Sequence, residues 1–323
     1  MLGGESEVSG MAARQERTYQ VLGVPLRTGS LVPGSENDAL PFREARLVER
    51  LREASGNALD AGDVEIPSYL PHHTVPPVRN WPGPRIAWDC VAARAGSLLG
   101  RPGNVPVLIG CDCSVVVGTV HALAATSSER DVYVLYLDRD WDDAGPDPTT
   151  YRSAAAMATW LVTQTSPFWP GPALQPEQVT VIGWSVPPAA GAPAAGAPGA
   201  MRSHPLEGIR SEGPTVTARR VLDAIPPSAS ILIHLDVDVF DRRQMPAAYF
   251  PHDGGLTLGE GTELFAGLAR DPRVRLIEVT EYASLRDPDL RWAGELTSLL
   301  VSGLSDGMRS ASRRSKGSSR RAG

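Results

Sequence analysis

The sequence has few cysteines, a single lysine and no long apolar run. Three cysteines occur in 323 residues, and Cys111 and Cys113 lie too close together to link separate parts of a fold. We therefore expect no disulfide framework and a reducing, cytoplasmic location. No apolar run reaches the roughly 20 residues that a membrane-spanning helix needs, so we expect no membrane partner. The first ten residues lack the charged and apolar regions of a secretory signal peptide.

The charge of the chain gives no reason to expect nucleic acid as a partner. The formal net charge is only −6 at pH 7. The one lysine, Lys316, lies in a basic tail that begins near Arg309 and contains no acidic residue. We expect the segments 1–17 and 307–323 to be disordered and residues 18–306 to form one domain. The low-complexity segment 187–200 is expected to be a flexible loop.

Residues 132–142 (VYVLYLDRDWD) combine a buried strand with a cluster of acids. The apolar run is typical of a strand that is buried on both faces. Asp138, Asp140 and Asp142 follow it, and an extended chain would place all three on one side. Three adjacent carboxylates repel one another unless a cation lies between them. This stretch is either a divalent-metal site at the end of a parallel strand or a solvated acidic turn.

A second stretch, residues 230–241 (SILIHLDVDVFD), has the same design. An apolar strand again ends in alternating acids, Asp236 and Asp238, with His234 in phase with both. The two sets of acids converge only if the two strands are neighbours in a sheet. His234 would then either orient a ligand carboxylate or replace a missing imidazole ligand.

Predicted strands alternate with predicted helices along the chain, which favours a three-layer α/β/α sandwich with a mostly parallel sheet. We expect strands at residues 19–24, 64–66, 104–110, 132–137, 178–184, 231–237 and 274–280. We expect helices at residues 42–54, 86–99, 114–125, 154–163, 215–224, 258–269 and 289–304.

Five short motifs follow one another in the order found in a known enzyme family. They are residues 110–114 (GCDCS), 138–142 (DRDWD), 234–242 (HLDVDVFDR), 254–257 (GGLT) and 278–281 (EVTE). With the start of the chain from Tyr19, they resemble the arginase–agmatinase–formimidoylglutamase (ureohydrolase) family up to about Leu304. The resemblance implies an arginase-like fold. It also implies hydrolysis of a guanidinium or amidine C–N bond by water that two Mn²⁺ ions activate.

The resemblance also implies roles for individual residues. By position, the metal ligands are Cys113, Asp138, Asp140, Asp142, Asp236 and Asp238. Glu281 matches the glutamate that pairs with the substrate's guanidinium and, with Asp138, is the expected catalytic residue. Glu278 takes this place if the alignment of that strand shifts. Thr149 and Tyr151 fall at substrate-contacting positions and complete the expected substrate-binding set with Glu281.

Several family residues are replaced in this chain. Cys113 and Asp140 stand where the family has histidine ligands, and Ala155 stands where it has a proton-shuttling histidine. Ala144 and the segment 184–187 lack the groups with which arginases hold the amino acid head of arginine. Arginine is therefore not the expected substrate.

One branch of the family, the N-hydroxyarginine hydrolases, is the nearest match to these changes. It tolerates a cysteine at the position of Cys113, and it resembles this chain at His234 and at residues 245–249. It keeps the histidine that Asp140 replaces here. The chain therefore looks like a member of a specialised branch with one further ligand altered.

The altered ligand set changes the expected metal content. Five carboxylates and a possible thiolate leave the site net negative even with two divalent ions, which would raise the pKa of bound water. A carboxylate-rich site favours Mn²⁺, Mg²⁺ or Ca²⁺, and Mn²⁺ fits the family best. We expect fewer than two tightly held ions. Cys113 is either a ligand or a small buried thiol.

Two function classes remain open. The first is a metal-dependent hydrolase of a linear guanidino, amidino or ureido C–N bond in a modified, non-arginine small molecule. The second is a catalytically inactive protein that keeps the fold and a structural or vestigial metal site. The loss of imidazoles favours the second class, and the retention of so many mutually repelling acids favours the first, which we prefer. A homo-oligomer is compatible with either class.

Overall fold

The computed structural model describes residues 17–25, 27–30, 34, 36–67, 70–73, 75–110, 112–127, 131–169, 171, 173–186 and 199–305. The segments expected to be disordered lie outside these residues, apart from Arg17, and so does most of the low-complexity segment 187–200. Among the described residues, no helix has both the length and the apolar character needed to cross a membrane.

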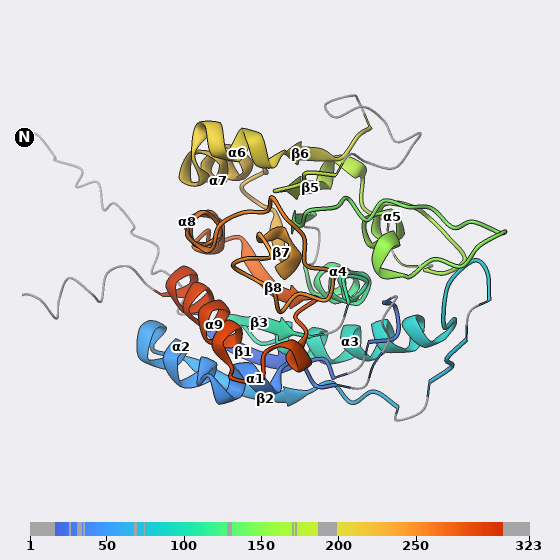
Figure 1. The fold of residues 1–323 in the computed structure, drawn as a ribbon, viewed down its shortest axis with the longest axis horizontal. Coiled ribbons are helices and arrows are strands. Elements are labelled where there is room, and N and C mark those ends of the chain that lie inside the picture. Colours follow the sequence, from blue (N-terminus) through green and yellow to red (C-terminus); the bar gives the residue numbers. More distant parts are fainter. Residues whose placement is uncertain are drawn as a thin grey trace, which may run out of the picture.

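The core of the protein is an eight-stranded sheet with the strand order β2-β1-β3-β8-β7-β4-β5-β6 (Figure 1). Every pair of neighbouring strands is parallel. The strands are β1 (Thr18–Gly23), β2 (Ala58–Asp63), β3 (Asn104–Ile109), β4 (Val132–Leu137), β5 (Val179–Ile182), β6 (Arg202–His204), β7 (Ser230–Asp236) and β8 (Val274–Thr280). The predicted α/β class with a parallel sheet is confirmed.

Helices cover both faces of the sheet. They are α1 (Leu40–Glu44), α2 (Leu47–Ser55), α3 (Gly83–Leu99), α4 (Val115–Thr126), α5 (Ala158–Thr163), α6 (Leu206–Glu212), α7 (Pro214–Asp223), α8 (Leu258–Ala269) and α9 (Arg291–Leu304). Figure 1 shows α2, α8 and α9 on one side of the sheet and α3, α4 and α5 on the other. Two separate apolar clusters match this division, one packed under each helical layer.

The apolar strands occur where the sequence predicts them, because β3, β4 and β7 are buried along their whole length. The outer parts of the sheet differ from the prediction. The strand expected at 64–66 lies earlier, as β2, whose sequence ALDAGD is mostly exposed at the sheet edge. The helix expected at 42–54 is split in two at Arg46, which has φ 62°. β6 and α6 were not predicted, since both are short and mostly polar.

Candidate metal centre

Three neighbouring strands end in acidic residues at the same edge of the sheet. β7 lies between β8 and β4, and Leu137 pairs with Leu235 while Asp236 pairs with Thr280. Asp138 directly follows β4, Asp236 is the last residue of β7, and Glu281 directly follows β8. The structure thus brings these three carboxylates to one edge, as the sequence predicts, although they are far apart in the chain.

The acids line a cavity of about 370 Å³. All six ligand positions implied by the family resemblance, and Glu281 as well, contribute to its lining. The lining residues are Cys113, Asp138, Asp140, Trp141, Asp142, Asp143, Ala144, Ser153, Ala155, Ala156, Asp236, Asp238, Phe250 and Glu281. No sequence pattern indicated Ser153, Ala156 or Phe250, which lie outside the acidic strand ends.

Thr149 and Tyr151 are not among the lining residues. Thr149 donates a hydrogen bond from its hydroxyl to the exposed Asp147 at 2.6 Å, and Tyr151 is 44% exposed beside Arg79. The structure therefore does not bring these two side chains together with the acids, and their substrate contacts stay a prediction.

Backbone turns fix the direction of the carboxylates. The backbone N–H of Asp140 donates to Asp138 Oδ1, and that of Asp238 donates to Asp236 Oδ1, both at 2.7 Å. Asp142 (φ 48°) and Glu281 (φ 58°) both adopt the left-handed conformation, which non-glycine residues rarely occupy. Such backbone strain clusters at functional sites, where it holds side chains in a required direction.

Several carboxylate oxygens face the cavity without a hydrogen-bond partner among the described residues. They are Asp138 Oδ2, Asp238 Oδ1 and Glu281 Oε2, and all three are buried. Asp236 Oδ2 instead accepts a hydrogen bond from the Cys113 thiol at 2.8 Å. Buried, unpaired acceptors are costly, and a cation is the simplest group that would satisfy those of Asp138 and Asp238, which share one group of candidate ligands.

The raised pKa values of the acids that line the cavity also indicate a site for a cation. Burial, followed by repulsion from Asp140 and Asp142, raises the pKa of Asp238 to about 8. Burial also raises the pKa of Asp142 to about 7, although the Tyr136 hydroxyl donates to its Oδ2 at 2.6 Å. The pKa values of Asp138 and Asp236 are raised well above normal by burial and by neighbouring carboxylates. A divalent ion would reverse these shifts by favouring the charged forms.

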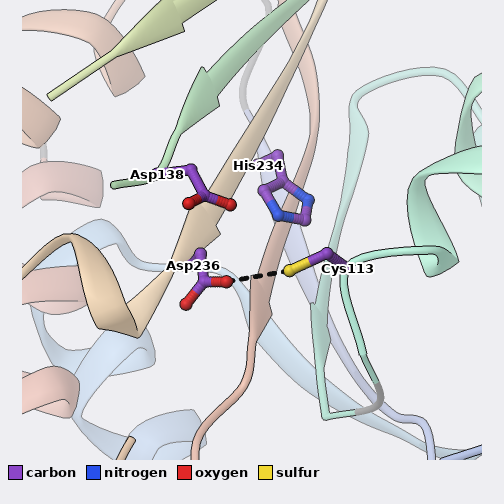
Figure 2. A group of neighbouring side chains, drawn as sticks. All are labelled: Cys113, Asp138, His234 and Asp236. Carbon is purple, nitrogen blue, oxygen red and sulfur yellow. Dashed lines mark hydrogen bonds between the residues drawn. The ribbon is translucent and has the colours of Figure 1, made fainter. Parts of the chain in front are cut away.

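The donor atoms fall into two groups that fit a metal ion. We call the first the inner position; it comprises Cys113, Asp138, His234 and Asp236 (Figure 2). We call the second the outer position; it comprises Asp138, Asp140 and Asp238. In each group the donor atoms lie within 4.8 Å of one another, and Asp138 belongs to both. Asp142 belongs to neither group.

Cys113 reaches the inner position from the turn between β3 and α4. The Asp112 carboxylate shapes this turn, because it accepts hydrogen bonds from the backbone N–H groups of Ser114 (3.0 Å) and Gly29 (2.9 Å). Burial, followed by repulsion from Asp236, raises the pKa of the Cys113 thiol well above normal. Without a metal ion, Cys113 is therefore a neutral thiol that donates to Asp236.

Apolar side chains form most of the remaining cavity wall, together with Asp143 and Ser153. Trp141 is buried and packs edge-on against Trp184, with ring centroids 5.4 Å apart. Ala144 and Ala155 lie in the lining where the family resemblance implies a carboxylate-binding asparagine and a proton-shuttling histidine. The cavity therefore offers a charged floor and a largely apolar wall.

Comparison with known proteins agrees with this geometry. The model of the arginase family matches residues 17–305. The arginase of Agrobacterium fabrum is 26% identical over 314 residues, which cover 93% of this chain and 96% of that protein. The N(omega)-hydroxy-L-arginine amidinohydrolase of Streptomyces lavendulae is 29% identical over 210 residues, which cover 64% of this chain and 70% of that protein.

Solved structures show the same fold. Arginase from Bacillus subtilis superposes with a TM-score of 0.75 at 20% identity, covering 90% of this chain and 100% of that one. Trypanosoma cruzi formiminoglutamase, solved with Mn²⁺, superposes with a TM-score of 0.69 at 16% identity, covering 91% of this chain and 95% of that one. From the family match over nearly all described residues, we conclude that this chain belongs to the arginase family.

Proposed function

We propose that this protein is a metal-dependent hydrolase that cleaves a C–N bond in a linear guanidino, amidino or ureido compound other than arginine. One observation carries the proposal. Carboxylates from three neighbouring strands converge on one cavity, with buried oxygens of Asp138, Asp238 and Glu281 unpaired. Keeping repelling acids together costs stability, so their convergence favours a working site over a vestigial one.

The chain's own residues have distinct roles in this proposal. The aspartates of the inner and outer positions hold the metal, for which Mn²⁺ fits the oxygen-rich outer position. A bound divalent ion lowers the pKa of water and stabilises the negative charge that develops during hydrolysis. Glu281, with one oxygen free in the cavity, binds the cationic end of the substrate and places its central carbon beside the metal-binding aspartates.

The cavity wall favours a substrate without an amino acid head. Ala144 cannot hydrogen-bond an α-carboxylate, and Trp141 and Phe250 present ring surface to the cavity. Cys113, His234 and the Streptomyces lavendulae relative support a likeness to the N-hydroxyarginine hydrolase branch. We propose a linear guanidino, amidino or ureido compound other than arginine, acted on in the cytoplasm.

A panel of guanidino, amidino and ureido compounds, incubated with the Mn²⁺-loaded protein, tests the proposal through release of urea, ammonia or amine. Wild-type protein should turn over at least one compound, and Glu281→Gln should lose that turnover without losing metal. Wild-type protein that binds metal but releases nothing from the whole panel would favour the second class, a non-catalytic member of the family. Ala155 is the observation that supports this second class, since it cannot carry a proton to the leaving group.

We expect free L-arginine to be turned over poorly or not at all. Ala144 and the segment 184–187 lack the asparagine and aspartate with which arginases hold the α-carboxylate and α-amino groups. A urea-release assay with Mn²⁺ checks this, with N-hydroxy-L-arginine and agmatine run in parallel. Arginase-like turnover of L-arginine would contradict the expectation.

A further inference from the structure

His234 is the one histidine that the structure places among the candidate ligand atoms of the described residues. It lies on β7, two residues before Asp236, so both side chains point to the same face of the sheet. Its side chain is fully buried. The resemblance to the arginase family implies no metal ligand at this position.

Hydrogen bonding fixes which nitrogen of His234 carries the proton. Nδ1 lies 2.7 Å from Glu278 Oε1, and a carboxylate in that position accepts the Nδ1 proton. The other oxygen of Glu278 accepts from the Thr119 hydroxyl at 2.8 Å, which holds the carboxylate in place. In the tautomer with its proton on Nδ1, Nε2 carries the lone pair that can bind a metal ion.

Packing fixes the plane of the ring. Tyr136, His234 and Glu278 are paired across β4, β7 and β8 in one register row. The imidazole stacks on the Tyr136 ring, with centroids 4.1 Å apart and an interplanar angle of 6°. The stacking thus fixes the ring plane, and a flip within that plane that turns Nε2 away would break the contact between Nδ1 and Glu278.

Nε2 faces the inner position. Its nearest hydrogen-bonding neighbour is Thr280 Oγ1 at 3.3 Å, which is long for a hydroxyl donor. A nitrogen of His234 lies within 4.8 Å of donor atoms of Cys113, Asp138 and Asp236, and Nδ1 is already engaged with Glu278. Figure 2 shows the imidazole beside Asp138 and next to the Cys113–Asp236 hydrogen bond.

We propose that His234 is a metal ligand of the inner position, through Nε2, with Glu278 as the positioning residue that orients it. Metal-binding histidines usually donate their second ring nitrogen to such a carboxylate. Cysteine binds a metal ion as the thiolate, so two carboxylates, a neutral imidazole and a thiolate carry three negative charges, of which one divalent ion balances two. The mixed nitrogen, sulfur and oxygen set favours Zn²⁺, Fe²⁺ or Co²⁺, whereas the all-oxygen outer position favours Mn²⁺ or Mg²⁺.

This inference rests on the metal site of the proposed function but not on catalysis, so its test uses no substrate. Metal-free protein is loaded with one equivalent of Zn²⁺, and X-ray absorption at the zinc edge reports the ligand atoms. We expect imidazole scattering in the wild type, because the described part of the chain includes all six histidines and only His234 belongs to a candidate group. A wild-type spectrum with oxygen or sulfur ligands and no imidazole overturns the proposal, whatever the variants do.

Variants give an independent readout. His234→Gln should lose the imidazole scattering and weaken Zn²⁺ binding by about tenfold or more, since even residues that only orient a ligand change affinity about 10–100-fold. His252→Gln is the matched control, because its ring lies on the loop after β7 but in neither candidate group. It should keep the imidazole signal and the affinity. If His252→Gln lost the imidazole signal while a folded His234→Gln kept it, the ligand would be His252. That result would refute the proposal.

Discussion

At the scale of single residues, the site departs from the expected family pattern at Cys113 and Asp140, where the resemblance implies imidazole ligands. Cys113 supplies a soft sulfur that hydrogen-bonds Asp236 at 2.8 Å, and Asp140 supplies a short carboxylate that adds to the repulsion around Asp238. The sulfur is soft, whereas Mn²⁺ prefers oxygen or nitrogen ligands, and the additional carboxylate of Asp140 leaves the site more negative than two divalent ions balance. The sequence identified both positions by alignment, but it left the role of His234 open. Only the contact between its Nδ1 and Glu278 showed which nitrogen is free.

Replacing both residues by histidine should raise Mn²⁺ occupancy. Cys113→His with Asp140→His leaves four carboxylates to balance two divalent ions, and it removes the soft donor. We expect calorimetric titration to show a second Mn²⁺ equivalent that the wild type lacks. Cys113→Ser with Asp140→Asn is the matched control, because it relieves charge without adding imidazole and should gain less. Two tightly bound equivalents in the wild type would refute this prediction.

At the scale of elements, the loop after β7 holds the outer acids against the sheet. Gly255 packs directly on the chain that follows Asp238: a Cβ there would lie 2.4 Å from the carbonyl carbon of Phe240 and 2.5 Å from Val239 O. The neighbouring Gly254 has φ +89°, and its Cβ would meet no atom within 4 Å. Within the motif 254–257, Gly255 is therefore needed for close packing, and Gly254 is needed for its left-handed backbone conformation.

Gly255→Ala should destabilise the fold far more than Gly254→Ala. The clash in Gly255→Ala is with backbone atoms that cannot rotate away, so we expect a loss of about 3 kcal/mol, the upper end for overpacking. Gly254→Ala pays only for its left-handed conformation, about 1–2 kcal/mol. Urea unfolding curves of the two variants measure the difference. Equal losses would show that the loop shifts to accept the methyl group.

Among the strands, sequence patterns locate best those that are buried along their whole length. Apolar runs identify β3, β4 and β7, because a strand with helices on both faces has no polar side. β2 was misplaced and β6 was missed, since they are the two edge strands and each is held by backbone hydrogen bonds to one neighbour. Thr149 and Tyr151 illustrate the same limit for the site: an alignment gives a position in a loop but not the direction of the side chain.

At the scale of the whole molecule, the site exists only because the strand order places β7 between β4 and β8. No spacing in the sequence predicts that order, although it predicts the acids at each strand end. The fold thus gathers buried carboxylates whose charges are uncompensated in the metal-free protein. That arrangement couples the stability of the whole domain to pH and to metal.

We expect the metal-free protein to lose stability as the pH rises from 6.5 to 8. The pKa values of Asp142 (about 7) and Asp238 (about 8) lie above that of an unfolded aspartate, about 3.9, so the folded state retains protons that the unfolded state has released. Each such proton lowers stability by up to about 1.4 kcal/mol per pH unit. The pKa of His252 is lowered to about 4, mainly by burial, whereas that of an unfolded histidine is about 6.5. Its titration therefore makes stability increase with pH, but only below about pH 6.5.

Thermal unfolding in the presence of a chelator measures this dependence. The melting temperature of the metal-free protein should fall between pH 6.5 and 8, and this fall should be smaller in Asp238→Asn. Saturating Mn²⁺ should remove it, because a ligand bound only by the folded state stabilises that state. A melting temperature of the metal-free protein that is constant or rises between pH 6.5 and 8 would contradict the burial of ionisable acids at the strand ends.

Mn²⁺ uptake by wild-type protein and by Asp138→Asn, measured side by side by equilibrium dialysis and elemental analysis, tests most directly whether these acids form a metal centre. Asp138 belongs to both donor groups, so a single change removes a ligand from each. We predict that the wild type retains between one and two equivalents of Mn²⁺, and that Asp138→Asn, still folded and relieved of one repelling charge, retains almost none. A wild type that takes up no divalent ion, or a variant that binds as much as the wild type, would contradict the assignment of this cavity as a metal centre.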